Sequence, residues 1–205
     1  MFAETPVAIP CPPMDEAQSK LPYTGDDEAD RLLADDPLAL LIGFVLDQQV
    51  PLQKAFSGPL ELSRRIGGLD ARRIADMPTD ELEAVFRQRP ALHRFPGNMA
   101  RRTQELCRHI VRDYQSDAGR VWHEARDGRD LQRRLLDLPG IGEMKAATLI
   151  AVLGKRLGVG PPGWEELAPR HPTLGDVDSP AALADYQASK RAYKAQLREQ
   201  EKPRR

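Results

Sequence analysis

Apolar residues recur at helical spacing along most of the chain, and this pattern predicts an all-α protein. The segment LALLIGFVL, residues 38–46, is apolar nearly all round, which is typical of a central, buried helix. Asp36 is suited to cap this helix and Pro37 to its first position. The polar stretch 47–49 follows abruptly, and Pro51 stops or kinks the chain. No segment has the two-residue alternation of a strand.

Other helices are predicted from the same periodicity and from capping residues. Thr79 is expected to cap one of them, and Ser179 with Pro180 to begin the last. Met99, Leu106 and Ile110 form the apolar stripe of the helix that starts at Phe95. The last helix has the stripe Leu183, Tyr186, Tyr193 and Leu197. The predicted segments are a short helix from Asp26, then 51–68, 69–77, 79–88, 95–114, one or two helices within 121–138, then 143–157 and 180–200.

Composition narrows the class of protein. The 205 residues carry a net charge of -1, with 30% charged and 5% aromatic residues, which favours a soluble helical protein over a β-sandwich. Cys11 and Cys107 are the two cysteines, too few for a disulfide framework, a zinc site or an iron–sulfur cluster. No apolar run reaches the roughly 20 residues of a membrane span, and no secretory signal is visible. We therefore expect a cytoplasmic protein.

A tight turn joins two helical patterns in LPGIGEMKAATLI, residues 138–150. Gly140 and Gly142 allow backbone angles and close approaches that a side chain would block. The helix that follows begins with free N–H groups and the positive end of its dipole, which is a phosphate-binding arrangement. Lys145, in the first turn, can add a charge. Taken alone, PGIG also fits a simple connection between two helices.

The extended pattern LxxLPGIGxxKAAxLIAVL, residues 135–153, is more specific. It resembles the helix-hairpin-helix of the HhH-GPD superfamily of DNA glycosylases, which includes endonuclease III and 3-methyladenine DNA glycosylase II. VLDQQVPLQKAF, residues 45–56, resembles the buried helix of that family with its Gln-containing loop. FPGNMARRTQEL, residues 95–106, resembles its Gly turn and basic helix. The three stretches occur in the family's order, and the resemblance covers roughly residues 37–157.

The resemblance implies an all-α, two-lobed fold with a DNA cleft between the lobes. Residues 26–167 would form the helical core, with the hairpin at 131–157. Residues 168–205 would form a loop and a C-terminal helix that docks on the N-terminal lobe, and residues 1–25 a flexible head. The implied partner is damaged double-stranded DNA, bound by a monomer associated with the nucleoid.

The resemblance also implies which residues contact DNA. A glycosylase extrudes the target nucleotide from the stack, and in the family a side chain of the loop after the buried helix fills the space. The matching positions are Gln48 and Gln49, of which Gln49 is favoured, although both amides could instead cap the helix. Arg101 and Arg102 begin the basic helix. Twelve arginines and six acids lie between residues 87 and 134, which indicates a basic face for phosphates or arginines paired with neighbouring acids.

The catalytic carboxylate is where the chain departs from the family. The resemblance implies an Asp about twenty residues after the hairpin, but Gly158–Leu167 contains none. Glu165 and Glu166 lie in that window. Asp178, in DVDSP, resembles the family's Val-Asp element but comes late. Each acid also suits an ordinary role in the first turn or at the cap of a helix.

Bifunctional family members carry a nucleophilic Lys at the position of Met144, and Lys145 would point about 100° away around the helix. The expectation is a monofunctional DNA N-glycosylase without lyase activity. The alternative is a non-catalytic protein that recognises damaged or distorted DNA on the same scaffold. Neither an iron–sulfur cluster nor any required cofactor is expected. The family's hairpin holds a monovalent cation, and the matching backbone carbonyls, those of Leu136, Leu138 and Ile141, would hold Na⁺ or K⁺. Trp164 would stack on a flipped base or fill the core.

Overall fold

A computed structural model describes residues 20–200, and the side chains of residues 20–192. Within these residues the regular elements are all helical, which confirms the predicted all-α class. The elements are α1 (Asp27–Asp35), α2 (Pro37–Leu46), α3 (Leu52–Ile66), α4 (Ala71–Asp76), α5 (Thr79–Arg87), α6 (Pro96–Tyr114), α7 (Arg120–His123), α8 (Gly128–Leu136), α9 (Glu143–Arg156), the 3-10 turns η2 (Trp164–Glu166) and η3 (Leu174–Asp176), and α10 (Pro180–Gln200). Among the helices described, none combines the length and apolar character that a bilayer span requires.

The core is built around α2, as its uniformly apolar sequence predicts. Every residue of α2 from Leu38 to Leu46 is buried. Asp36 caps the helix by accepting the N–H groups of Leu38 and Ala39, at 2.8 and 3.4 Å. Phe56 of α3 packs edge-on against Phe44 of α2. α2 therefore anchors the helices on either side of it.

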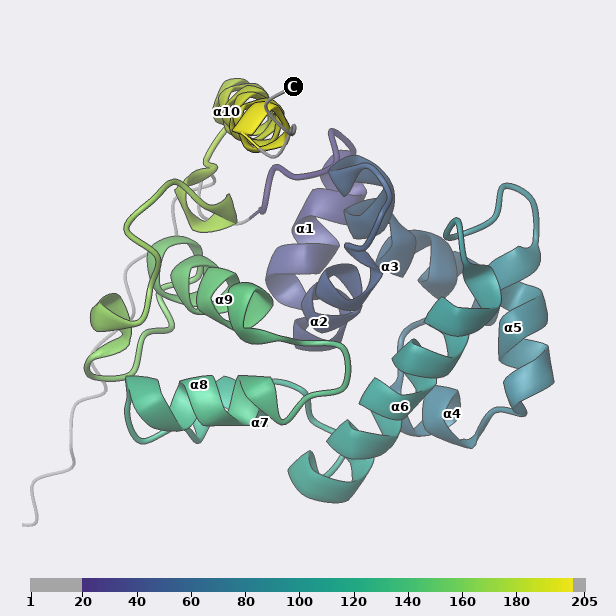
Figure 1. Cartoon of the computed structure of the whole chain (residues 1–205). Coiled ribbons are helices and arrows are strands. Elements are labelled where there is room, and N and C mark those ends of the chain that lie inside the picture. Colours follow the sequence, from purple (N-terminus) through teal and green to yellow (C-terminus); the bar gives the residue numbers. More distant parts are fainter. Residues whose placement is uncertain (1–19, 201–205) are drawn as a thin grey trace, which may run out of the picture.

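The remaining helices form two groups beside α1–α3 (Figure 1). On one side α6 packs against α4 and α5, and it also contacts α2. On the other side α9 packs against α8, η2 and η3. The predicted apolar stripe of α6, Met99, Leu106 and Ile110, is buried, and so is Trp122 of α7.

The start of the folded part differs from the expected boundary. Residues 21–25 fall within the head proposed from the sequence, yet Leu21 and Tyr23 are fully buried. The hydroxyl of Tyr23 donates to the carbonyl of Leu174 at 2.8 Å, and burial raises its pKa well above the ordinary range. These residues belong to the core because of a contact 151 positions away in sequence. Residues 1–19 of the expected head lie outside the described residues.

Two helix starts show how closely capping signals are followed. Ser179 caps α10 as predicted, because its hydroxyl accepts the N–H of Ala182 at 3.2 Å. Thr79 does not cap α5: the cap is Pro78, and Thr79 is the first helical residue. The Thr79 hydroxyl instead donates to Gln104 of α6 at 2.8 Å. A tertiary partner has here replaced the local cap.

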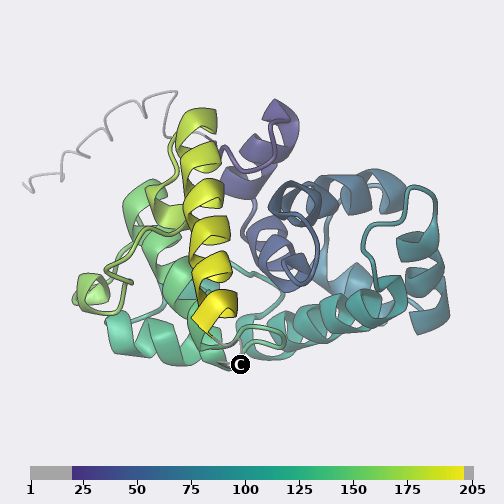
Figure 2. The same ribbon diagram turned by 45° about the horizontal axis from the view of Figure 1, so that its top comes forward.

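α10 contacts the body through its first turns. Leu183 is buried and Tyr186 half-buried. Leu183, Ala184 and Gln187 share a shallow hollow with Thr24 and with Gln53, near the start of α3. Figure 2 shows α10 along the outside of the molecule. The side chains of Tyr193 and Leu197, expected in the same stripe, lie outside the described residues.

Candidate nucleic-acid interface

The hairpin between α8 and α9 exposes a helix N-terminus. Gly140 lies in the left-handed region, at φ 85°, and a Cβ there would be 3.4 Å from the side chain of Val45. Gly142 is the N-cap of α9, and no side chain caps that helix. A Cβ on Gly142 would meet nothing within 4 Å. The first-turn amides of α9 therefore face an open surface, which is the geometry that binds phosphate.

Lys145 links the hairpin to the end of α2. Its Nζ donates to the carbonyl of Phe44 at 2.6 Å and to that of Gly140 at 3.4 Å. The pKa of Lys145 is lowered to about 8, mainly by burial; the charge of Asp47 opposes this shift and that of Arg102 adds to it. The ammonium is thus directed at backbone carbonyls, whereas the sequence suggested an outward charge for phosphate. Lys145 holds the two elements of the surface together.

The two glutamines have different surroundings. The Gln48 Nε2 donates to the carbonyl of Val45 at 2.9 Å, and its Oε1 accepts from Arg102 at 2.6 Å. Gln48 therefore has the capping role that the sequence left open. Gln49 is exposed and lies in the left-handed region, at φ 55°. A bulky residue at positive φ is strained and calls for a reason, and an exposed amide offered to a ligand is such a reason.

His93, which no sequence pattern singled out, supports this turn. Its ring is buried; Nε2 lies 2.9 Å from the carbonyl of Gln48, and Nδ1 accepts the N–H of Phe95 at 3.0 Å. These partners require a neutral ring with its proton on Nε2. Burial lowers the pKa of His93, which favours that neutral form at physiological pH.

Phe95 and Arg94 extend the surface and were not identified from the sequence. Phe95 is 41% exposed, and the guanidinium of Arg94 lies 5.3 Å from its ring centroid. An exposed aromatic ring beside a cation is a surface on which a nucleobase stacks. The available signal was the run His-Arg-Phe-Pro just before α6. Met144, next to the hairpin, is 81% exposed.

The structure therefore brings together most of the residues predicted to bind DNA. Gly140 packs on Val45, Lys145 reaches Phe44, and Arg102 holds Gln48. Arg102 binds a neutral amide, so its charge remains beside the Gln48–Gln49 turn. Arg101 is directed differently, because it forms an ion pair with Glu83 of α5. We call the residues Gly140, Gly142, Lys145, Gln48, Gln49, Arg94, Phe95 and Arg102 the hairpin surface.

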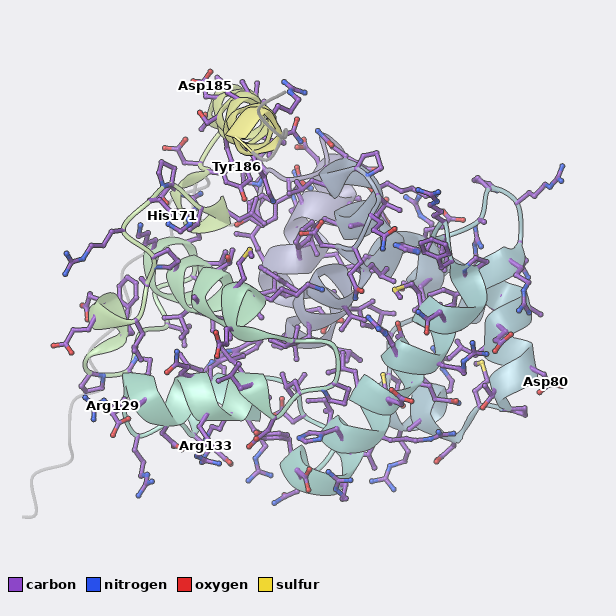
Figure 3. The ribbon with its side chains drawn as sticks, in the orientation of Figure 1. Asp80, Arg129, Arg133, His171, Asp185 and Tyr186 are labelled. Atoms are coloured by element: carbon purple, nitrogen blue, oxygen red, sulfur yellow. The ribbon has the colours of Figure 1, made fainter. Side chains whose placement is uncertain are left out.

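The arginines between residues 87 and 134 largely pair with acids. Figure 3 shows Arg129 and Arg133 directed away from the body on α8. Ion pairs are formed by Arg87, Arg101, Arg112, Arg120, Arg126, Arg133 and Arg134, seven of the twelve. The alternative that the sequence left open, arginines paired with neighbouring acids, thus accounts for most of this segment.

Asp130 is the most strongly held of these acids, and it gives a stability prediction. Its buried carboxylate accepts from Arg133, from the N–H of Arg126 at 3.2 Å and from Arg134 at 3.1 Å. These hydrogen bonds hold its pKa well below the usual range. Asp130→Asn is expected to lower the free energy of unfolding at pH 7 by about 2 kcal/mol, measured by urea denaturation.

The pH dependence of that loss has a definite sign. Because the folded-state pKa is depressed, the stabilisation is present above the unfolded-state pKa of about 3.9 and disappears as the pH falls through the folded value. The difference between wild type and Asp130→Asn should shrink below about pH 4. Asp137→Asn, which removes an exposed partner of Arg133, is the control with little effect. A difference that stays constant down to pH 3 would contradict the assignment.

Glu165 and Glu166 lie away from the hairpin. They are exposed on η2, which packs against α8 and α9. The ring of Trp164 covers Gly154 in the last turn of α9, and it also packs beside Gly160. Because Gly142 is at the other end of α9, about 18 Å of helix separates the two sites. Trp164 thus packs against a helix, and its two acids are not brought to the hairpin surface.

Asp178 is an exposed acid between η3 and α10. Its neighbour Asp176 is engaged by Lys155 at 2.6 Å, whereas α10 leads to the hollow lined by Gln53. Gln53 is four residues after Gln49. Of the three predicted acids, Asp178 is therefore the one that directly precedes a helix in contact with the start of α3. Asp47, the C-cap of α2, is a half-buried acid whose charge acts on Lys145, and the sequence reading had not proposed it.

The carbonyls predicted to hold a monovalent cation lie within the hairpin. The N–H of Ile141 donates to the carbonyl of Leu138 at 3.1 Å, which closes the turn. A carbonyl has two lone pairs, so this bond leaves Leu138 able to accept again. Binding of Na⁺ or K⁺ by Leu136, Leu138 and Ile141 stays a prediction, which DNA affinity in potassium against tetramethylammonium salts of equal ionic strength would test.

Comparison with known proteins gives one finding. Residues 42–200, more than three quarters of the chain, match the family model of HhH-GPD superfamily base excision DNA repair proteins. Comparisons with curated proteins and with solved structures found no significant match. The matched region contains the Gln48–Gln49 turn, Phe95 and the whole hairpin, which are the elements that converge on one surface. The chain therefore belongs to the HhH-GPD superfamily of base excision DNA repair proteins.

Proposed function

We propose that the protein is a monofunctional DNA N-glycosylase that binds damaged double-stranded DNA as a monomer. The observation that carries the proposal is the position of the exposed Gln49 beside an uncapped helix N-terminus, with Lys145 linking α2 to the hairpin. The helix N-terminus can hold a phosphate, and the Gln49 side chain can fill a gap in the base stack. Membership of a base excision repair family supports their joint use on DNA.

In this proposal the amides at Gly142 and the following residues hold a phosphate of the damaged strand. Arg102 adds positive charge next to the turn, and Phe95 offers its ring to a base. Gln49 enters the space left by the extruded nucleotide, because its side chain is exposed while Gln48 is held by Val45 and Arg102. The damaged base would then be outside the stack, where chemistry can reach its glycosidic bond.

Hydrolysis needs a carboxylate. It stabilises the positive charge that builds on the sugar or takes a proton from the attacking water, and water oxygen replaces the base on the sugar carbon. We propose Asp178 for this role, with Asp47 as the competing acid that lies at the hairpin surface. Glu165 and Glu166 remain in the test, although their separation from the hairpin along α9 counts against them.

A lyase reaction is not proposed. That reaction needs an amine to attack the sugar, and Met144 occupies the family's lysine position. Lys145 has a pKa near 8, which would suit a nucleophile, but its amine donates to the carbonyls of Phe44 and Gly140.

A second function is favoured by one observation. Glu165 and Glu166, the acids in the window where the family has its carboxylate, lie at the far end of α9 from the hairpin. A protein without a carboxylate at the site would recognise damaged or distorted DNA without cutting it. This non-catalytic function uses the same hairpin surface.

The experiment is a glycosylase screen with purified full-length protein. Duplexes carrying alkylated, deaminated or oxidised bases are incubated with wild type and with Asp178→Asn, Asp47→Asn, Glu165→Gln and Glu166→Gln, and abasic sites are revealed by alkali. Asp178→Asn is expected to lower excision at least about 100-fold, while the two Glu variants stay near wild type. Loss of excision in Asp47→Asn alone would transfer the role to Asp47. Lesion binding without abasic product in any duplex would favour the non-catalytic function.

A further inference from the structure

Charge is distributed very unevenly along the chain. Residues 190–205 contain seven Lys or Arg and two Asp or Glu, which gives a charge of +5. Because the whole chain carries -1, residues 1–189 carry -6. Three of those negative charges lie in residues 1–19, outside the described residues, so residues 20–189 carry -3. This net charge repels a polyanion, and many arginines of the body are already in ion pairs. Residues 87–102 also carry +5, from five arginines, but Arg87 and Arg101 among them pair with Glu83. The C-terminal segment is thus one of two concentrations of positive charge in the sequence.

Beyond its first turns, α10 is uncovered over residues 188–192. Leu183 is buried and Tyr186 half-buried, but each residue from Ala188 to Ala192 is exposed. Five consecutive residues point all the way round a helix, so no face of α10 is covered there. Figure 3 shows Tyr186 directed towards the body and Asp185 away from it, which marks the last turn that docks.

The composition of the second half of α10 suits an anionic partner. Lys190 and Arg191 are exposed, and the Lys190 ammonium lies 5.4 Å from the ring centroid of Tyr186. Lys190, Lys194 and Arg198 recur every four residues within the bounds of α10, a spacing that places residues on one side of a helix. A short helical segment is marginal by itself, and like charges four residues apart weaken it further. A polyanion would stabilise it.

We propose that the second half of α10 is a separate DNA-binding element, which contacts the phosphate backbone outside the hairpin surface. The proposal rests on the proposed DNA-binding function. The first turns of α10 share a hollow with Gln53, four residues after Gln49, so the helix begins beside the start of α3. The partner is DNA because the family acts in base excision DNA repair, and because the charge of +5 on residues 190–205 is complementary to the phosphates of a DNA strand.

The test uses the salt dependence of binding by the full chain. In the variant Lys190→Gln, Arg191→Gln, Lys194→Gln and Arg198→Gln, glutamine keeps helix propensity and removes charge. Each lost phosphate contact lowers the slope of log K against log salt by about 0.9. We expect the slope for an undamaged duplex to fall by about 2 to 4 and the affinity at 0.1 M salt to fall by about 10- to 100-fold. Circular dichroism checks that the body is folded.

A matched variant separates a local effect from bulk charge. The control variant removes four cations between residues 20 and 72, through Lys20→Gln, Arg31→Gln, Arg64→Gln and Arg72→Gln. It changes the net charge by the same amount and should leave the slope within about 0.5 of wild type. Equal losses in both variants would overturn the proposal. So would an unchanged slope together with altered sedimentation, which would make α10 a contact between copies. If wild type itself binds no DNA, the proposed function fails too. If wild type binds DNA and the α10 variant binds with the same affinity and salt dependence, this inference alone fails.

Discussion

Gly142→Asp is expected to weaken DNA binding about 30- to 150-fold without loss of stability. The new carboxylate would stand at the N-terminus of α9, where the phosphate is proposed to bind. Loss of the helix N-terminus as an anion site and repulsion between two negative charges together amount to about 2 to 3 kcal/mol, which gives that range of affinity. Titration of a labelled duplex by fluorescence anisotropy measures the effect.

The fold should tolerate this change because the position has room and a suitable conformation. Gly142 has φ -98° and ψ 178°, in the extended region, and its Cβ would meet nothing within 4 Å. Asp is also a good N-cap, so the melting temperature should stay the same or rise. Gly142→Asn has the same shape without the charge, and should bind clearly more tightly than the Asp variant. Equal binding by Asp, Asn and wild type would remove the hairpin from the interface.

Gln49→Ala is expected to lower the rate of base excision about 10- to 100-fold while binding to undamaged duplex is kept. The side chain contributes only after the nucleotide has left the stack, and an unfilled gap gives back part of the unstacking energy of a few kcal/mol. Single-turnover excision with enzyme in excess reports this step, and anisotropy with undamaged DNA reports binding.

The backbone at Gln49 supplies the control. Its φ of 55° is strained for a residue with a side chain. Gln49→Gly therefore removes the side-chain amide and also relieves the backbone strain. Gly and Ala should lose excision to a similar extent if the side chain is what matters. Full excision activity in both variants would contradict the role of the Gln49 side chain. Activity lost only in Gln49→Ala would indicate that the geometry of the turn matters instead. Gln48→Ala differs from these variants because it removes the side chain that accepts a hydrogen bond from Arg102.

The sequence was informative where a signal is local. The buried α2 follows from nine apolar residues behind an Asp-Pro start, and the hairpin follows from glycine spacing, because backbone angles and helix periodicity act within a few residues. The Gln48–Gln49 turn was found in the same way. The different surroundings of Gln48 and Gln49 could not be predicted, because the bond from Arg102 to Gln48 joins residues 54 positions apart.

What the sequence could not predict has a shared physical cause, which is contact between residues far apart in the chain. Tyr23 was placed in the head because Pro-rich neighbours hide the fact that it reaches Leu174. Glu165 and Glu166 were proposed from their spacing to the hairpin, but their location is fixed by Trp164 packing over Gly154, a contact that no pattern encodes. Lys145 was predicted to add a charge at the hairpin, and its bond to α2 could not be predicted because the carbonyl that it binds lies 101 residues earlier.

That bond from Lys145 has a consequence for how far the protein reads along a strand. The lysine ties the helix start that is proposed to hold a phosphate to α2, and the turn that carries Gln49 follows directly after α2. The bond therefore restricts movement of the two relative to each other. The distance between them then works as a fixed ruler: once a phosphate is seated, a single nucleotide position lies opposite Gln49. The choice of nucleotide to be tested for damage would be set by the protein's own dimensions, and the protein would inspect a strand in discrete steps of one phosphate.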